Sequence, residues 1–276
     1  METINNAKTL LDAGVASAAP NILIEGGIPY VVAPENYRIK QLEDMLPAPV
    51  RKRSKVTTTD TEGFIYYTHK HGKDGNTVIY ADIDGESNKF NLLAVLDDHG
   101  YKASDAQWRE HRCQFEPAQA VEWKRWVGKN KAVFSQAEFA TWLEDNLADI
   151  ATVLNMPTGA DILQMALGFE ANAEKRLRSK INLQNGGVRF EFIEDEDKDT
   201  RASMEVFQRF TLGLPVFEGS SSAYPLEARL KYREKEGKVT FWFELIRPDR
   251  VFKDAVNDEL NRIKDATGFP VIAGKP

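Results

Sequence analysis

The sequence contains a single cysteine, Cys113, so no disulfide bond can form within the chain. It has no apolar run near the roughly 20 residues that a membrane helix needs. Its first residues, METINNAKTLLDAG, lack the apolar core of a signal peptide. These absences predict a protein without a membrane partner that resides in the cytoplasm, where thiols stay reduced.

Positive charge is also scarce, because 36 Lys and Arg face 42 Asp and Glu, which gives a formal net charge of -6. Non-specific affinity for nucleic acid comes from Lys and Arg that neutralise phosphates, so this balance disfavours a general DNA-binding protein. One local exception is RKRSK, where Arg51, Lys52, Arg53 and Lys55 could contact phosphates. A short basic run of this kind is more often a solvated loop.

Motifs of nucleotide-binding and hydrolytic enzymes are missing as well. No convincing GxGxxG, GxxxxGK(S/T), GxSxG or compact D…ExK nuclease motif occurs in the chain. The acidic run EDEDKD at 194–199 lacks the alternation and the central glycine of a calcium-binding loop, and we expect a solvated hairpin loop there. We therefore expect no catalytic residues and no cofactor.

The composition that is present is that of a globular protein, with 42% hydrophobic and 28% charged residues over 276 positions. Residues 1–116 are predicted to form an N-terminal α+β region. A helix is expected over 2–13, ended by Gly14, and a hairpin over 22–32. A second helix, capped by Thr59 or Asp60 and stopped by Gly72, is expected next, and strands are expected over 77–84, 90–96 and from 111 onward.

Residues 117–182 are predicted to form a helical region. Ser135 and Glu138 make an S-x-x-E capping box just ahead of an apolar stripe with helical spacing. A second helix is expected to follow and to continue to about residue 180. Because the link between them is short, the two helices should pack as an antiparallel pair.

Residues 183–276 return to an alternating pattern and are predicted to form a C-terminal β-hairpin region with a terminal helix over 249–266. The segments LEARLKYRE and KVTFWFELI are joined at Glu236–Gly237, the strongest hairpin signal in the chain. The fold class is therefore α+β, with antiparallel sheet regions at both ends of the chain and a helical hairpin in the middle. The three regions are expected to form one compact subunit.

Residues 97–115, DDHGYKASDAQWREHRCQF, hold two of the four histidines and the only cysteine. On a strand His111 and Cys113 would face the same side, and His69 and His71 could supply two further ligands to a zinc ion. The spacing matches no known metal motif, so metal binding is the weaker alternative. The simpler interpretation packs Cys113 in the core and leaves His111 in solvent, which requires a bulge or a partly exposed face.

The same stretch raises the question of acid–base chemistry at Asp97-Asp98-His99-Gly100. Such chemistry needs a partner whose pKa is tuned by burial, whereas a polar turn after a strand has the same composition. We predict a strand over 90–96, a polar excursion over 97–108 and a strand over 111–115. Trp108 is expected to fold back over the end of the sheet.

EWKRW at 122–126 interleaves tryptophan with basic residues, as platforms for single-stranded nucleic acid do. On a helix, however, Trp123 and Trp126 are three apart and would share a face. A pair buried in the core is the more common outcome, and nucleic-acid contact through these residues is the alternative.

Several stretches together resemble the YfdQ-like proteins of unknown function, a family known from tailed phages and prophages. The matching pieces run in order from about residue 22 to 255 and include GIPYVVAPENYRI, AVLDDHG, FATWLEDNLADI, FTLGLPVFEG and ARLKYREKEGKVTFWFELIRPDRVFKDA. The resemblance implies a phage or prophage origin and expression in the bacterial cytoplasm. It implies no catalytic residues.

Three hypotheses follow. The first is a non-enzymatic phage-derived protein that self-assembles into a homo-oligomer, with a closed shell as one form. The second is an accessory factor in phage DNA metabolism, which binds single-stranded DNA through RKRSK and EWKRW, or a factor in host-defence evasion. The third and least favoured is a metal-dependent hydrolase that uses His69, His71, Asp98, His99 and His111.

Overall fold

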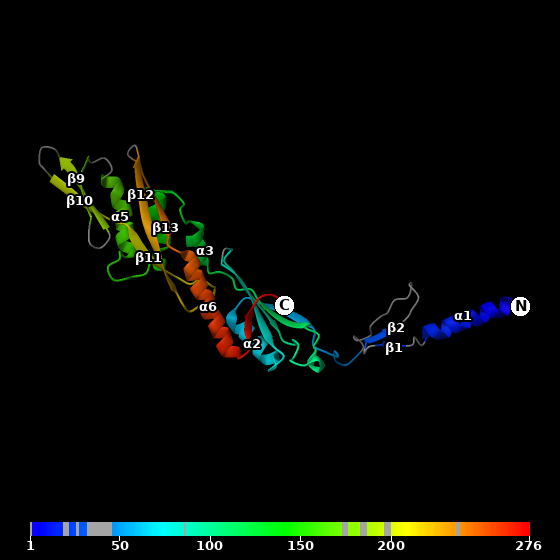
Figure 1. Cartoon of the computed structure of the whole chain (residues 1–276). Helices are drawn as coiled ribbons and strands as arrows, with labels where there is room; N and C mark the ends of the chain where they lie inside the picture. The colour runs from blue at the N-terminus through cyan, green and yellow to red at the C-terminus, as the bar shows by residue number, and fades with distance from the viewer. Residues whose placement is uncertain are drawn as a thin grey trace. The chain divides into compact units, whose positions relative to one another are not determined.

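The computed structural model describes residues 2–18, 22–25, 28–31, 46–85, 87–172, 176–182, 187–195, 200–235 and 238–276. Within these residues the chain forms six α-helices and several β-sheets (Figure 1). The chain divides into an N-terminal unit, Met1–Lys52, and a main unit, Arg53–Pro276. None of the described helices is long and apolar enough to cross a membrane.

The N-terminal unit contains one helix and one hairpin. Helix α1 spans Glu2–Ala18, so the predicted end at Gly14 is wrong. A glycine inside a helix costs only about 1 kcal/mol, which the rest of the helix can offset. Strands β1 (Ile22–Glu25) and β2 (Ile28–Val31) pair antiparallel, which confirms the predicted hairpin.

A five-stranded sheet opens the main unit, in the order β14-β4-β5-β6-β3. Its members are β3 (Ser54–Thr58), β4 (Val78–Asp84), β5 (Lys89–Val95), β6 (His111–Phe115) and β14 (Val271–Ala273). The three central strands pair antiparallel, whereas β14 and β3 join the edges in parallel. Parallel neighbours need a long crossover, and helices precede β14 and follow β3 along the chain.

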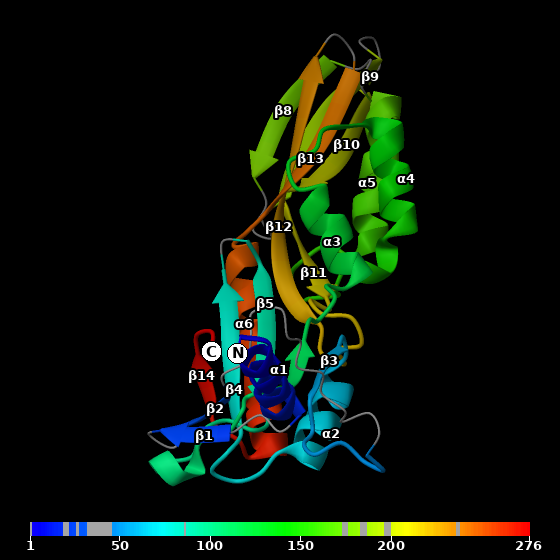
Figure 2. The ribbon, with the colours of Figure 1, turned by 90° about the vertical axis from the view of Figure 1, so that its right-hand side faces the viewer.

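One face of this sheet is covered by α2 (Thr61–His71) and α6 (Pro248–Thr267). Asp60, one of the two residues predicted to cap this helix, is the N-cap of α2, and its carboxylate accepts a hydrogen bond from the Gly63 backbone N–H. The Phe64 ring of α2 lies 5.4 Å from that of Phe115 on β6. Helix α6 is visible behind β4 and β5 in Figure 2, and it starts and ends within a residue of the prediction.

The second sheet is antiparallel, in the order β11-β12-β13-β7. Its strands are β7 (Phe134–Ser135), β11 (Arg209–Leu214), β12 (Tyr224–Lys235) and β13 (Lys238–Leu245). Strands β12 and β13 pair up to Lys235 opposite Lys238, which confirms the predicted hairpin, although residues 236 and 237 lie outside the described residues. The α+β fold class is confirmed.

Three helices pack together beside this sheet (Figure 2): α3 (Val121–Gly128), α4 (Gln136–Asp145) and α5 (Gly159–Asn172). Ser135 and Glu138 form the predicted capping box at the start of α4. The Gln136 amide donates to the Ala166 carbonyl over 2.7 Å, which brings the start of α4 to the later part of α5, as an antiparallel pair requires.

The predicted extension of the second helix to residue 180 is wrong. Helix α5 ends at Asn172, and Arg176–Asn182 is strand β8 of a further sheet with β9 (Gly187–Asp195) and β10 (Thr200–Phe207). Pairing of β8 with β9 overrides the local helical pattern, as neighbouring strands often do. The acidic run predicted to be a hairpin loop joins β9 to β10, and its residues 196–199 lie outside the described residues.

A single core joins the two larger sheets of the main unit. The Phe217 ring lies 5.5 Å from Phe90 of the five-stranded sheet and 5.7 Å from Phe252 of α6. The Ala120 backbone N–H donates to the Val216 carbonyl over 2.9 Å at the same place. This continuity explains how short strands and helices form one stable body.

Candidate functional site

The excursion between β5 and β6 is fixed at its base by Asp97. The two carboxylate oxygens of Asp97 accept the backbone N–H groups of Glu110 and His111, each over 3.0 Å. The strand, polar excursion and strand predicted for this stretch are confirmed, with a short 3-10 turn at Ala103–Asp105 inside the excursion. Asp97 therefore sets the start of β6.

Asp98 is buried and binds two side chains. Its carboxylate accepts the Tyr80 hydroxyl over 2.6 Å and lies 2.9 Å from Nε of Arg109. Arg109 in turn donates to the Tyr80 hydroxyl over 3.1 Å and has a left-handed backbone, with φ of 57°. Burial and the hydrogen bond to Asp98 raise the pKa of Tyr80. This network attaches the excursion to β4, which is a structural task for Asp98.

The other aromatic groups of the excursion lie toward solvent. His99 is exposed, and its Nδ1 accepts the Gln107 backbone N–H over 3.0 Å. Trp108 is 69% exposed, so the prediction that it covers the end of the sheet is wrong. The polar contacts of Asp97 and Asp98 already hold the excursion, so it does not need the indole as an anchor.

His111 and Cys113 share the buried face of β6, as their spacing predicts. The prediction that His111 lies in solvent is wrong, because α2 covers it. The Tyr67 hydroxyl lies 3.0 Å from Nε2 of His111, and the His71 ring lies 5.1 Å from the His111 ring. Burial raises the pKa of the Cys113 thiol to about 11, so the thiol stays protonated at neutral pH.

The candidate metal ligands do not come together as a set. His69 is exposed, whereas His71, His111 and Cys113 lie between α2 and β6. In the part of the chain that the structure describes, which contains every histidine and the cysteine, no group of three or more His, Cys, Asp or Glu could hold a metal ion.

The residues singled out for nucleic-acid contact also separate. Arg51 and Lys52 belong to the N-terminal unit, and Arg53 and Lys55 belong to the main unit. Lys55 is exposed on β3, and Nε of Arg53 lies 3.6 Å from the Glu110 carboxylate. The RKRSK run therefore crosses the boundary between the two units.

The two tryptophans of EWKRW are buried on the inner side of α3, which confirms the interpretation that they are core residues. Trp123 is 1% exposed and Trp126 is 0% exposed. The Trp126 ring lies 5.0 Å from Phe243, and its Nε1 donates to Asp149 over 2.7 Å. Neither indole presents a face on which a base could stack.

A hollow of about 300 Å³ lies on the face of the five-stranded sheet away from the core, beside Tyr80, Leu93 and Arg112. Two of the basic side chains along it share one carboxylate. The Asp82 carboxylate lies 2.8 Å from the Lys89 ammonium and 3.2 Å from that of Lys275, and the hydrogen bond from Lys89 lowers the pKa of Asp82. The Arg112 Nε donates to the Arg109 carbonyl over 2.6 Å, so this group too already has a partner in the chain.

An apolar stripe on α1 is a feature that the sequence analysis missed. Ala7, Leu10, Leu11 and Gly14 follow the i, i+3, i+4, i+7 spacing of one helix face. All four are exposed, with Leu10 at 74% and Leu11 at 67%. The spacing could have been read from the sequence, but exposure could not. This stripe is the candidate contact surface of the N-terminal unit.

These features define an α+β protein with a continuous core in its main unit and an exposed apolar stripe on the helix of its N-terminal unit. The chain belongs to the DUF2303 family of uncharacterized conserved proteins, whose family model matches residues 3–276. Comparisons with curated proteins and with solved structures gave no match.

Proposed function

We propose that this protein is of phage or prophage origin and acts in the bacterial cytoplasm by self-assembly into a homo-oligomer, not by catalysis. The resemblance to YfdQ-like proteins supports the origin. The exposed stripe of α1 is the main observation that supports self-assembly.

A helix in water gains most of its stability from packing an apolar face, because helix propensity alone is too weak. The described part of the N-terminal unit offers α1 little to pack against. Of its residues whose side chains the structure describes, all are exposed except Arg51, which is half-buried. A hairpin of four-residue strands such as β1 and β2 is itself marginal in isolation. Leu10 and Leu11 would therefore gain stability from a partner that covers them.

A second copy of the chain supplies that partner with no further component. Two-fold interfaces are self-complementary, so Leu10 and Leu11 of one copy can meet the same residues of the other. Ala7 and Gly14 at the ends of the stripe are small and allow the two helix backbones to approach. Each leucine that moves from water into such a contact contributes roughly 1.5–3 kcal/mol.

The local contacts of Asp97, Asp98 and His111 support a non-enzymatic role, because each of these side chains takes part in holding the excursion or the sheet. The competing hypothesis of a metal-dependent hydrolase is tested by metal analysis of the purified protein. We expect no stoichiometric zinc, manganese or iron, and one such ion per chain would favour the hydrolase.

Mass photometry and electron microscopy of the purified full chain test self-assembly. We expect particles of at least two copies of the 31.2 kDa chain, since a two-fold contact through α1 alone gives a dimer. Closed shells need further interfaces and would appear as larger rounded particles of uniform diameter. A single species near 31.2 kDa at all micromolar concentrations would contradict the proposal.

A further inference from the structure

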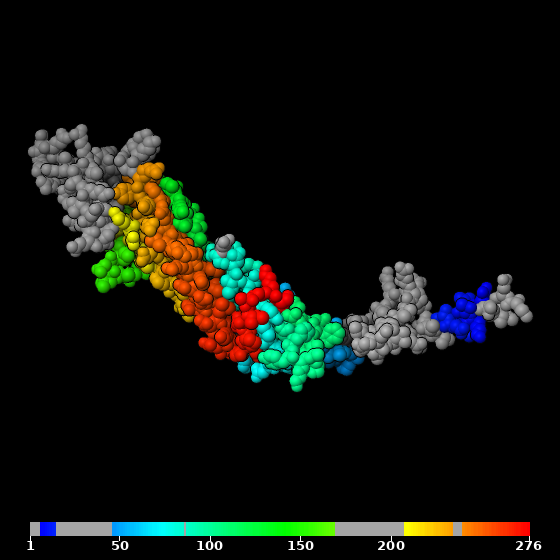
Figure 3. Space-filling model, in the orientation of Figure 1, coloured from blue at the N-terminus to red at the C-terminus, as the bar shows by residue number. Residues whose placement is uncertain are grey.

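Basic side chains gather on the outer face of the four-stranded sheet. Arg229, Lys231 and Arg233 are alternate residues of β12, so they share one face, and all three are exposed. Alternate residues of a strand are about 7 Å apart. Residues of β12 and β13, orange in Figure 3, lie at the surface of the main unit.

The pairing of β11 with β12 adds a fourth basic side chain to this row. Arg209 of β11 stands directly opposite Arg229. Like charges directly opposite one another destabilise a sheet, so this pair is a cost to the fold that a ligand of negative charge would offset. We call Arg209, Arg229, Lys231 and Arg233 the basic row.

Among the side chains that the structure describes, two carboxylates flank the basic row and neutralise it only in part. Glu227 lies 3.7 Å from Arg209, and both side chains are about half exposed, so water and salt screen the pair. Glu244 stands opposite Arg229 on β13. Four cations against two carboxylates leave positive charge here on a chain whose formal net charge is -6.

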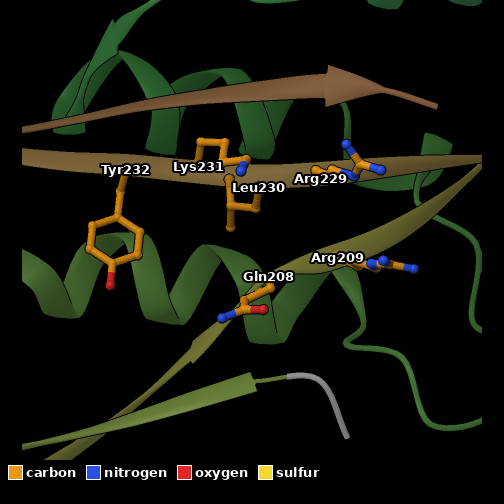
Figure 4. Close-up of a pocket in the computed structure, with 6 residues that line it drawn as sticks. All are labelled: Gln208, Arg209, Arg229, Leu230, Lys231 and Tyr232. Atoms are coloured by element: carbon orange, nitrogen blue, oxygen red, sulfur yellow. The ribbon is translucent and has the colours of Figure 1, made fainter. Parts of the chain in front are cut away.

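A hollow of about 460 Å³ opens beside the basic row where two sheets separate. Strand β11 pairs with β12 only as far as Arg209, and the preceding strand β10 pairs with β9 instead. Figure 4 shows Leu230 and Tyr232 on one side of β12 and Lys231 on the other. The hollow is lined by Gln208, Arg209, Arg229, Leu230, Lys231 and Tyr232.

The chemistry of this lining suits an anion. None of the described lining residues is acidic, and five of the six carry a side-chain hydrogen-bond donor. Arginine pairs with phosphate through two parallel N–H···O bonds, which gives both affinity and orientation.

An aromatic ring adjoins the basic row. Trp242 of β13 stands opposite Lys231 and is half-buried, and the Arg233 guanidinium carbon lies 5.8 Å from the centre of the Trp242 ring. Surfaces that bind single-stranded nucleic acid combine basic side chains along the sugar-phosphate backbone with an aromatic ring on which a base can stack. A base held in a duplex could not reach the ring in this way.

We propose that the basic row, its hollow and Trp242 form a binding site for single-stranded nucleic acid. Arg209, Arg229 and Lys231 contact consecutive phosphates, and a base packs against Trp242. The site goes beyond self-assembly and does not depend on it. It also differs from the surfaces predicted from the sequence, because Trp123 and Trp126 are buried.

Fluorescence anisotropy of the full chain with a labelled oligo(dT) in low salt tests this site. We expect the logarithm of the binding constant to fall with the logarithm of salt concentration with a slope of about -2, from three phosphates at roughly 0.7 each. The double variant Arg229→Glu, Lys231→Glu should weaken binding by roughly tenfold or more.

The matched control changes the same total charge elsewhere. Arg250 and Lys253 are exposed on α6, and the variant Arg250→Glu, Lys253→Glu should bind within about threefold of the native chain. The charge-preserving variant Arg229→Lys, Lys231→Arg should retain most of the binding. Circular dichroism and thermal melting check that all variants keep the fold.

Tryptophan fluorescence gives an independent readout. Binding should quench part of the emission, and Trp242→Phe should remove that quench. Trp108→Phe, which removes the exposed indole of the excursion, should leave the quench in place.

Several results would overturn the site. One is the absence of oligo(dT) binding in low salt, and another is an equal loss of binding in the α6 control. A third is a loss of binding on changing Arg51, Lys52, Arg53 and Lys55 to Glu while the basic-row variant binds normally. Tighter binding of duplex than of single strands would also contradict it. So would binding of inorganic phosphate without any binding of oligo(dT).

Discussion

The two units of the chain differ in how far their apolar side chains are exposed. In the main unit Trp126, Phe210 and Phe243 are 0% exposed and contact one another around α3 and the second sheet. In the N-terminal unit Leu10 and Leu11 are 74% and 67% exposed on a regular helix. The main unit therefore contains its own source of stability, whereas the two leucines on the apolar face of α1 are exposed.

The largest expected difference between the units is the cost of removing one apolar side chain. Trp126→Ala should lower the free energy of unfolding by about 3–5 kcal/mol, because it leaves a cavity between Phe210, Phe243 and Trp142. Leu10→Ala should change it by less than about 0.5 kcal/mol at concentrations that give monomers. Urea denaturation of both variants measures the two values, and equal costs would show that α1 is buried in the monomer.

The excursion between β5 and β6 is largely exposed, like the described part of the N-terminal unit, but hydrogen bonds of Asp97 and Asp98 fix it. Asp98→Ala should lower the free energy of unfolding by about 1.5–3 kcal/mol, since it removes a charged acceptor from Tyr80 and Arg109. Asp74→Ala, at an exposed turn position, is the control and should stay within about 0.5 kcal/mol. If both variants unfold alike, the Asp98 network does not stabilise the excursion.

A smaller effect is expected at the start of α4, where a local motif stabilises a helix of the main unit. Ser135→Ala should lower the free energy of unfolding by about 1 kcal/mol at neutral pH. Hydrogen bonds from the Ser135 backbone and side chain lower the pKa of Glu138. The carboxylate therefore adds stability above its unfolded pKa of about 4.3, and this contribution is lost as the pH falls through the lower folded value.

Denaturation curves from pH 7 to pH 3 check that sign. The difference between the native chain and Ser135→Ala should shrink below about pH 4. The matched variant Glu138→Gln keeps a side chain of the same shape and should show less of this pH dependence. A difference that grows toward acid would contradict the assignment.

Features set by neighbouring residues could be predicted from the sequence, and those set by distant partners could not. The Ser135 capping box and the strand pattern around Val95 depend on spacing within a few residues. The burial of His111 depends on Tyr67 and His71 of α2, which no local pattern reveals. For the same reason Arg176–Asn182 follows its partner strand β9 and not its helical neighbours.

The candidate sites follow the same rule. Side chains alternate between the two faces of a strand, so Arg229, Lys231 and Arg233 share one face and could have been identified from the sequence. The position of Arg209 opposite Arg229 depends on the register between two strands and could not. The helical spacing of Leu10 and Leu11 is local, but their exposure is a property of the fold.

Mass photometry of the full-length variant Leu10→Glu, Leu11→Glu tests the role of α1 in assembly most directly. Leu154→Glu is the control, because Leu154 is 88% exposed in the main unit and lies outside α1. We predict that the native chain and Leu154→Glu form the same assembly, whereas the double variant gives a monomer near 31.2 kDa. Assembly of the double variant to the native size would contradict the account.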